Sequence, residues 1–393
     1  MSMMRQFDVV IVGGGVVGSA IAFNLVSLAP RLSVVVIERD PTYQAASSAL
    51  SVSSIRQQFS TAVNIAMSRY SMTFLRQIAE HLAVDDTVPD IGLVEQGYLY
   101  LATLAGENAM RNNHVIQREC DVDVALLDPA ELGRRFPWLS TADLALGSLG
   151  ESGEGWFDGF SVLQAFRRKA QALGAVYMTG EVAGLDMARG IVNAVVLNDG
   201  TRIGCGKVVN AAGPHARAIA TMAKVELPVF PEKHCVFVFD CKDPPSSCPL
   251  TIDPSGLYFR PEGRFFISGP PRQETPFSDN PDLIVDYGLF DELVWPTLAA
   301  RVPAFESIKL VGAWAGYYEM NVFDYNAVLG ISPTVPNLYF ANGFSGHGMQ
   351  QAPAAGRALG ELIVFGEYRT LDLSILSYER LLKHEPVRET NII

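Results

Sequence analysis

A glycine-rich turn near the start of the chain has the spacing of a dinucleotide-binding site. The run Gly13-Gly14-Gly15-Val16-Val17-Gly18 fits G-x-G-x-x-G, and Glu38 follows about twenty residues later. Glycines here allow a tight turn and a close approach of the backbone to a pyrophosphate, whose charge the next helix N-terminus stabilises. The carboxylate of Glu38 would accept hydrogen bonds from the adenosine ribose. The turn therefore predicts dinucleotide binding; the alternative is an ordinary glycine-rich turn.

A strand, a helix and a second strand must hold this turn. Residues 7–12 form a short apolar run that ends at glycine, which is typical of a strand buried in a parallel sheet. A helix over residues 15–29 follows, and the β-branched residues 33–37 predict the next strand. These elements predict a βαβ unit, and hence an α/β fold.

Further along the chain we expect more of this α/β pattern and a second lobe. Helices are predicted over residues 62–82 and from Ser161, which forms a capping-box pattern with Gln164. Between about residues 225 and 325, aromatic β-rich segments alternate with prolines, which predicts a mixed, largely antiparallel sheet of α+β type. The predicted domains are a discontinuous cofactor-binding domain (1–85, 146–222 and 325–393) and a substrate domain (86–145 and 223–324).

Composition excludes several other classes of protein. Of the 393 residues 49% are hydrophobic and 18% are charged, which predicts a globular chain with a large core. The net charge of −12, without a basic stripe, argues against a nucleic-acid partner. The five cysteines lack the spacing of a disulfide framework or a metal site. We also expect no membrane span and, by default, a cytoplasmic location.

Two later motifs carry a resemblance to a known family. The segment 208–213, Val-Val-Asn-Ala-Ala-Gly, and the loop 343–351, which contains Gly346-His347-Gly348, resemble motifs of the D-amino acid oxidase and sarcosine oxidase superfamily. Segments 47–59 and 314–318 are similar to one of its subgroups, the FAD-dependent oxidoreductase domain-containing proteins. The resemblance implies a Rossmann-like FAD-binding domain, and FAD rather than NAD as the cofactor.

Position by position, the resemblance places the loop 346–349 at the flavin and a helix starting near Pro353, whose positive end would face the flavin C2 carbonyl. Ser47, Ser48 and Ser51 would lie beside the pyrophosphate and flavin, or else belong to a polar loop. The residues predicted to contact FAD are Gly13, Gly15, Val17, Gly18, Glu38, Arg39, Ser47, Ser48, Ser51, Val182, Ala212, Gly213, Ser345, Gly346, His347, Gly348 and Met349.

The resemblance also implies substrate residues. Arg56 corresponds to a substrate-binding arginine of sarcosine oxidases, and a guanidinium suits a carboxylate; the alternative is a surface or inter-lobe salt bridge. Arg260 is a second candidate cation. Tyr258 corresponds to a substrate-facing tyrosine, and Tyr317 and Tyr318 come from the segment expected over the flavin; the alternative is a core position. His347 would be structural, or would assist proton transfer. The predicted catalytic residues are Arg56, Tyr258, Tyr318 and His347.

Two departures from the family pattern narrow these expectations. Some sarcosine oxidases attach flavin to a cysteine in the segment that corresponds to residues 314–324, where this chain has none, so we expect non-covalent FAD. Gln350 stands where those enzymes carry a carboxylate-binding lysine, which puts sarcosine itself in doubt.

The leading hypothesis is oxidation of a primary or secondary amino acid to an imine, with hydride passing to flavin N5. The partners would be a small amino acid or amine and an electron acceptor, either oxygen or another molecule. Two alternatives remain: oxidation of a 2-hydroxy acid, and a flavoprotein whose main role is partner binding or assembly.

Overall fold

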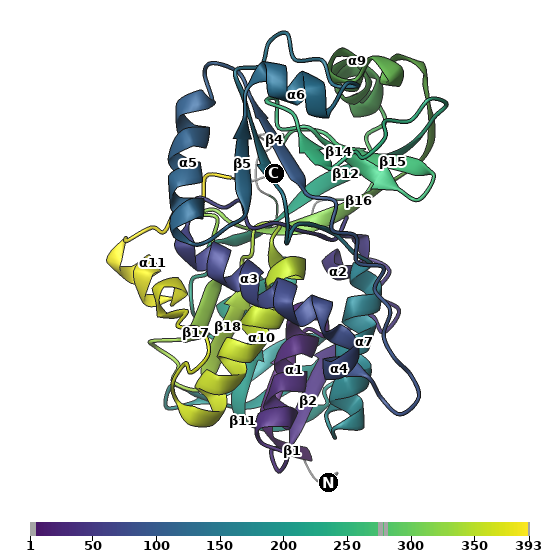
Figure 1. Cartoon of the computed structure of the whole chain (residues 1–393). Coiled ribbons are helices and arrows are strands. Elements are labelled where there is room, and N and C mark those ends of the chain that lie inside the picture. Colours follow the sequence, from purple (N-terminus) through teal and green to yellow (C-terminus); the bar gives the residue numbers. More distant parts are fainter. Residues whose placement is uncertain (1–4, 274–277, 279–281, 392–393) are drawn as a thin grey trace.

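Two large sheets organise the chain (Figure 1). The computed structural model describes residues 5–273, 278 and 282–391. At its centre, β1 (Arg5–Val12) pairs in parallel with β2 (Val34–Glu38), and α1 (Val16–Leu28) connects them. Alternate residues of β1 enter the hydrophobic cores on opposite faces of the sheet, Val9 on one and Val10 on the other. The predicted βαβ unit is therefore present.

The first sheet is mostly parallel around β1. Its path runs β17-β18-β11-β1-β2-β8, and β10 and β9 are added to β11 as antiparallel strands. Strand β11 brings the 208–213 motif directly beside β1, with Asn210 paired to Val12. The further strands are β8 (Val176–Thr179), β9 (Val182–Ala188), β10 (Ile191–Leu197), β11 (Arg202–Asn210), β17 (Val328–Ile331) and β18 (Leu338–Asn342).

The second sheet is mostly antiparallel, in the order β16-β12-β15-β14-β13-β4-β6-β5, with β13 and β4 the parallel pair. Its strands are β4 (Tyr98–Ala102), β5 (Val124–Leu127), β6 (Leu146–Gly150), β12 (Val229–Cys241), β13 (Leu250–Ile252), β14 (Tyr258–Glu262), β15 (Phe265–Gly269) and β16 (Ile308–Asn321). A small separate pair joins β3 (Ser54–Ile55) to β7 (Gly155–Trp156). The predicted α/β domain with a largely antiparallel second sheet is thus confirmed.

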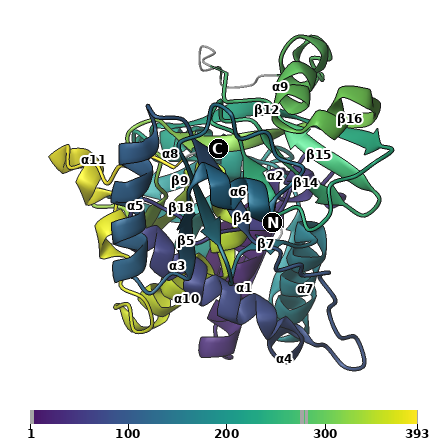
Figure 2. The ribbon, with the colours of Figure 1, turned by 45° about the horizontal axis from the view of Figure 1, so that its top comes forward.

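Helices cover both sheets, as the two views of the chain show (Figures 1 and 2). Residues of α1, α3, α7 and α10 share one core with the first sheet, while α6 and α9 pack on the second sheet around Leu132 and Phe305. The helices are α1, α2 (Ser47–Leu50), α3 (Ala62–Arg76), α4 (Ile78–Leu82), α5 (Glu107–Glu119), α6 (Pro129–Arg135), α7 (Gly159–Ala172), α8 (Ala216–Met222), α9 (Trp295–Arg301), α10 (Gly348–Phe365) and α11 (Glu379–Lys383).

Two predicted helix starts are wrong. The N-cap of α7 is Asp158, whose carboxylate accepts a hydrogen bond from the Ser161 N–H at 3.1 Å, so Ser161 lies inside the first turn. Helix α10 begins at Gly348 rather than near Pro353, because the Gln351 N–H already bonds the His347 carbonyl at 3.0 Å. The N-terminus of α10 consequently lies within the glycine-rich loop itself.

The predicted helix over residues 62–82 is also divided, into α3 and α4, which meet at Gln77.

The predicted boundary between the substrate domain and the cofactor-binding domain, at residues 145 and 146, falls next to β6. Strand β6 pairs with β4 and β5 in the second sheet. We therefore propose that the substrate domain extends through Gly150, and that the cofactor-binding domain resumes after it.

Candidate active site

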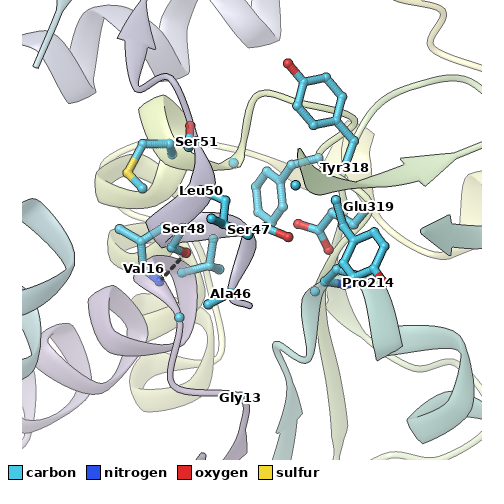
Figure 3. Close-up of a pocket in the computed structure, with 18 of the residues that line it drawn as sticks. Gly13, Val16, Ala46, Ser47, Ser48, Leu50, Ser51, Pro214, Tyr318 and Glu319 are labelled. Carbon is cyan, nitrogen blue, oxygen red and sulfur yellow. Dashed lines mark hydrogen bonds between the residues drawn. The ribbon is translucent and has the colours of Figure 1, made fainter. Parts of the chain in front are cut away.

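A long cavity lies where the two sheets meet, with about 1180 Å³ of empty space that includes its open mouth. The glycine turn, α2 and the loop before α10 line one side of it, while Tyr258 comes from the second sheet. Figure 3 shows Gly13 and α2 on one side of the cavity and Tyr318 and Glu319, also from the second sheet, on the other. Strands far apart in the sequence therefore build one site.

Backbone geometry explains the glycines at one end of this cavity. Gly13 has a φ of +101°, and a Cβ there would lie 2.3 Å from the Ala211 carbonyl oxygen. A Cβ on Gly18 would lie 2.0 Å from the Gly13 carbonyl oxygen. Only glycine allows β1, α1 and β11 to approach this closely. Gly15, which is the N-cap of α1, makes no side-chain cap and faces the cavity instead.

Glu38 is held in the position predicted for it at the end of β2. Its Oε2 accepts a hydrogen bond from the Gly14 N–H at 2.8 Å, and its Oε1 accepts one from the Asp40 N–H at 2.9 Å. Nearby, Arg39 Nη2 lies 2.7 Å from His215 Nε2, which must be the acceptor because a guanidinium only donates. Glu38, Arg39 and His215 all line the cavity.

Three observations show that this cavity fits FAD. The N-terminus of α1 faces one part of the cavity, and Gly348 and Met349 at the N-terminus of α10 face another, so two helix dipoles favour negative charge there. The Ser47 hydroxyl is buried beside the cavity and has no partner within the described residues, so it can serve a bound phosphate or flavin. Ser48 Oγ accepts from the Val16 N–H at 3.0 Å and orients this wall (Figure 3).

Most residues predicted to contact FAD line this cavity. Those that do are Gly13, Gly15, Val17, Glu38, Arg39, Ser47, Ser48, Ser51, Ala212, Gly213, Gly346, Gly348 and Met349. Four others are outside the lining. Gly18 packs on the turn, Val182 begins β9, and Ser345 Oγ accepts from the Asn321 N–H at 3.0 Å. His347 lines the smaller neighbouring cavity instead. Their contacts with FAD stay a prediction.

A smaller cavity opens beside the first and collects all four predicted catalytic residues, Arg56, Tyr258, Tyr318 and His347. Tyr258 and Tyr318 line both cavities, as do Val52 and Gly346. A molecule in the smaller cavity would therefore lie against the cofactor. Tyr98, Ser54, Leu250 and Gln350 complete its wall.

Arg56 and Arg39 are the only arginine or lysine side chains that line either cavity, within the part of the chain that the structure describes. The side chain of Arg56 is 1% exposed. Nη1 donates to the Gln58 carbonyl at 2.8 Å, and Nη2 donates to His347 Nε2 at 3.0 Å and to the Asn391 carbonyl. Every one of these acceptors is neutral, so among the described residues no carboxylate is in hydrogen-bond contact with the buried charge.

Burial sets the protonation states around Arg56. Desolvation, followed by the charge of Arg56, holds the pKa of His347 well below its usual value, so its ring is neutral at pH 7 with the proton on Nδ1. Burial raises the pKa of Tyr318 to about 12 and the pKa of Tyr258 well above its ordinary range. Both phenols are therefore protonated hydrogen-bond donors.

The other candidates have different surroundings. Arg260 lines neither cavity; its Nη1 bonds Glu262, and its Nη2 donates to the Val52 carbonyl at 2.7 Å. Tyr317 lines the larger cavity only. Gln350, at the position of the family's lysine, accepts from the Arg56 backbone N–H through Oε1 at 3.0 Å and so fixes the backbone just after β3.

Sequence reasoning missed three polar side chains of the larger cavity: Glu319, His234 and His215, the partner of Arg39. Glu319 accepts a hydrogen bond from the Gly343 N–H at 3.1 Å, and burial raises the pKa of its carboxyl to about 7. His234 projects from β12 and bonds Glu232 Oε1 through Nε2 at 3.0 Å. Glu319 and His234 come from the second sheet, and neither belongs to a local motif.

The part of the chain that the structure describes lacks two further features. No group of His, Cys, Asp or Glu side chains is arranged to hold a metal ion in that part of the chain. No helix among those residues has both the length and the apolar character needed to cross a bilayer.

Comparison with known proteins agrees with the site. The profile of the family described as FAD dependent oxidoreductase matches residues 8–362. FAD-dependent oxidoreductase domain-containing protein 1 of Xenopus laevis is 45% identical over 99% of this chain and 85% of its own. Glycine oxidase of Geobacillus kaustophilus is 28% identical over 92% of this chain and 94% of its own. L-proline dehydrogenase of P. horikoshii superposes with a TM-score of 0.84 at 27% identity, covering 98% of this chain and 100% of that one.

The profile match over most of the chain also confirms the predicted cofactor and the predicted resemblance. With a glycine turn, an acidic strand end and two helix N-termini around one cavity, this chain belongs to the family of FAD-dependent oxidoreductases.

Proposed function

We propose that this flavoprotein oxidises an amino acid, through its primary or secondary amine, to the corresponding imine. One observation carries the proposal: Arg56 presents a buried guanidinium, whose acceptors among the described residues are all neutral, in a small cavity that shares a wall with the cofactor cavity. A buried cation is costly unless a counter-charge reaches it, and a substrate carboxylate supplies one.

The residues around Arg56 support a substrate of this class. Tyr258 and Tyr318 are protonated donors on the wall shared by both cavities, so they can orient a carboxylate and bound the pocket. Neutral His347 holds Nη2 of Arg56, which assigns it a positioning role rather than proton transfer. Bound FAD would supply the hydride acceptor at N5. The chain's task is then to hold the substrate C–H bond over the ring.

The names of two relatives, glycine oxidase and L-proline dehydrogenase, point to the same substrate class, one with a primary and one with a secondary amine. We propose non-covalent FAD, because none of the five cysteines, all of them described, lines either cavity. The electron acceptor would be oxygen or another molecule.

Anaerobic mixing of the FAD-loaded protein with a panel of amino acids tests the proposal. We expect at least one amino acid to bleach the flavin absorbance, while the 2-hydroxy acid of the same side chain does not. Bleaching by the hydroxy acid alone would replace the proposal with the hydroxy-acid alternative.

Variants separate catalysis from a purely structural flavin. Arg56→Met should abolish bleaching while FAD stays bound, and Arg56→Lys should retain part of it, because lysine keeps the charge but not the bidentate geometry. Gly15→Val, whose side chain would enter the cavity, should lose FAD itself. If cellular function survives Arg56→Met but not Gly15→Val, the protein acts mainly through partner binding.

A further inference from the structure

The end of the described chain reaches the guanidinium of Arg56. Residues 385–391 form no helix or strand, and within them Glu389 is buried while its neighbours on both sides are exposed. Asn391 accepts a hydrogen bond from Arg56 Nη2 through its backbone carbonyl. A segment far from the glycine turn in sequence therefore contacts the group that we assign to substrate binding.

The geometry of a guanidinium makes this contact important. A carboxylate binds in bidentate fashion either across both terminal nitrogens or across Nε and the terminal nitrogen beside it, and each arrangement uses a hydrogen of Nη2. Both Nη2 hydrogens are engaged, one by His347 Nε2 and the other by the Asn391 carbonyl. One of these acceptors must leave before a substrate carboxylate can bind Arg56 through two hydrogen bonds.

Of the two acceptors, Asn391 is the one that can move. His347 is 5% exposed, is the N-cap of α10 and packs edge-on against Phe59 with ring centroids 5.0 Å apart. Asn391 instead lines a third cavity of about 920 Å³, together with Asn113 and Tyr100. Its carbonyl can withdraw into that space without disturbing a packed core.

Asn391 makes three further hydrogen bonds within the described residues. Its N–H donates to the Glu389 carboxylate at Oε1, at 2.9 Å. Its Nδ2 donates to the Gln58 carbonyl at 3.1 Å, and its Oδ1 accepts from Asn113 Nδ2 on α5 at 3.0 Å. Glu389 is held in turn by Ser60 and Thr61. The segment thus has a firm anchor at Glu389, to which the Asn391 N–H is tied. Its tip, the side chain and carbonyl of Asn391, is held by two neutral side-chain hydrogen bonds and the bond to Arg56.

This inference rests on the function proposed above. We infer that the Asn391 carbonyl is a gate, a group that blocks the substrate-binding guanidinium of Arg56 until a substrate displaces it. The carbonyl occupies Arg56 Nη2 when no substrate is present, and a carboxylate substrate displaces it. A neutral carbonyl is exchanged for an anion, so the charge-assisted bonds to the carboxylate favour opening. Molecules without a carboxylate cannot make this exchange, so the gate adds selectivity for carboxylates.

Benzoate and benzamide, followed by flavin difference spectra of the FAD-loaded protein, test the gate. Asn391→Ala and Asn113→Ala each weaken the closed state by removing hydrogen bonds of the tip, so benzoate should bind roughly fivefold more tightly for each bond lost. Asn112→Ala, at an exposed neighbouring position of α5, is the matched control and should leave benzoate affinity unchanged. Benzamide affinity should be the same in all of these proteins.

The result separates the gate from the function on which it rests. If Arg56→Met and Arg56→Lys leave benzoate binding intact, Arg56 is not the carboxylate anchor, and both proposals fail. If benzoate needs Arg56 but binds Asn391→Ala and Asn113→Ala with unchanged or lower affinity, the gate alone is overturned. Absence of benzoate binding in every protein, Asn391→Ala included, also overturns it.

Discussion

The imidazole of His234 stacks on the phenol ring of Tyr318, with ring centroids 3.9 Å apart and planes inclined by 22°. Glu232 orients the imidazole through Nε2, and Arg272 holds Glu232 in turn with an ion pair at 2.8 Å. Tyr318 borders both cavities, so the position of its ring depends on a stack built from β12.

Replacing His234 tests what this stack contributes. His234→Ala removes the ring, whereas His234→Phe keeps a ring but loses the bond to Glu232, so comparing them isolates stacking. We expect His234→Ala to have a free energy of unfolding about 1 kcal/mol lower than His234→Phe, measured by chemical denaturation with excess FAD. Equal stability of the two variants would show that the stack contributes little.

Glu154 predicts a pH dependence of stability. It is fully buried and accepts from the Gln58 N–H at 2.9 Å, and burial raises the pKa of its carboxyl to about 7. Because the folded state holds the proton more tightly than the unfolded state, this contribution is complete below about pH 4.5 and is lost as the pH rises to about 7. The loss is on the order of 3 kcal/mol.

Denaturation of wild-type protein and Glu154→Gln at several pH values measures this effect. The wild type should lose stability relative to the variant between pH 4.5 and 7, and the difference should be constant at higher pH. Glu306→Gln, which changes an exposed carboxylate, is the control and should follow the wild type. A constant difference across the whole range would contradict the prediction.

Glu319 predicts a pH dependence of the flavin potential. Its carboxyl lines the cofactor cavity and has a pKa of about 7 because of burial. Above that pH its negative charge opposes the reduced, anionic flavin by on the order of 1 kcal/mol, or roughly 20 mV for a two-electron couple. Reference-dye titrations should show the wild-type potential falling further between pH 6 and 8 than that of Glu319→Gln. Parallel curves would remove Glu319 from any role in tuning the flavin.

Acid precipitation distinguishes the mode of cofactor attachment. With no cysteine on either cavity wall, we expect the flavin to appear entirely in the supernatant after the protein is precipitated. The absorbance of the supernatant measures the released fraction. Flavin that stays with the pellet would mean a covalent bond to another side chain of the cavity.

The sequence predicted those site residues whose positions are fixed by elements close to them in the chain. Gly13 and Glu38 are set by one βαβ unit, whose spacing follows from strand and helix geometry, so the sequence alone located them. The resemblance added Arg56 and His347. Arg56 Nη2 and His347 Nε2 lie 3.0 Å apart, although the two residues are 291 positions apart in the sequence.

His234 and Asn391 could not be located in this way. His234 reaches the site because β12 pairs with β16 in a register that places His234 opposite Gly316. Asn391 reaches it because the segment anchored by Glu389 returns across α3 to residues 58–64. Long-range register and the path of an irregular segment leave no periodic signal in the sequence. The start of α10 was misplaced for a related reason, since helix packing outweighed the local tendency of Pro353.

The walls of the cofactor cavity come from segments between Gly13 and Met349. During synthesis, the glycine turn leaves the ribosome long before its counterpart at the flavin. The nascent chain therefore has no complete FAD site until Met349 has emerged. Cofactor capture must follow the synthesis of both sheets, and a cell short of FAD would accumulate protein with an unfilled cavity between them.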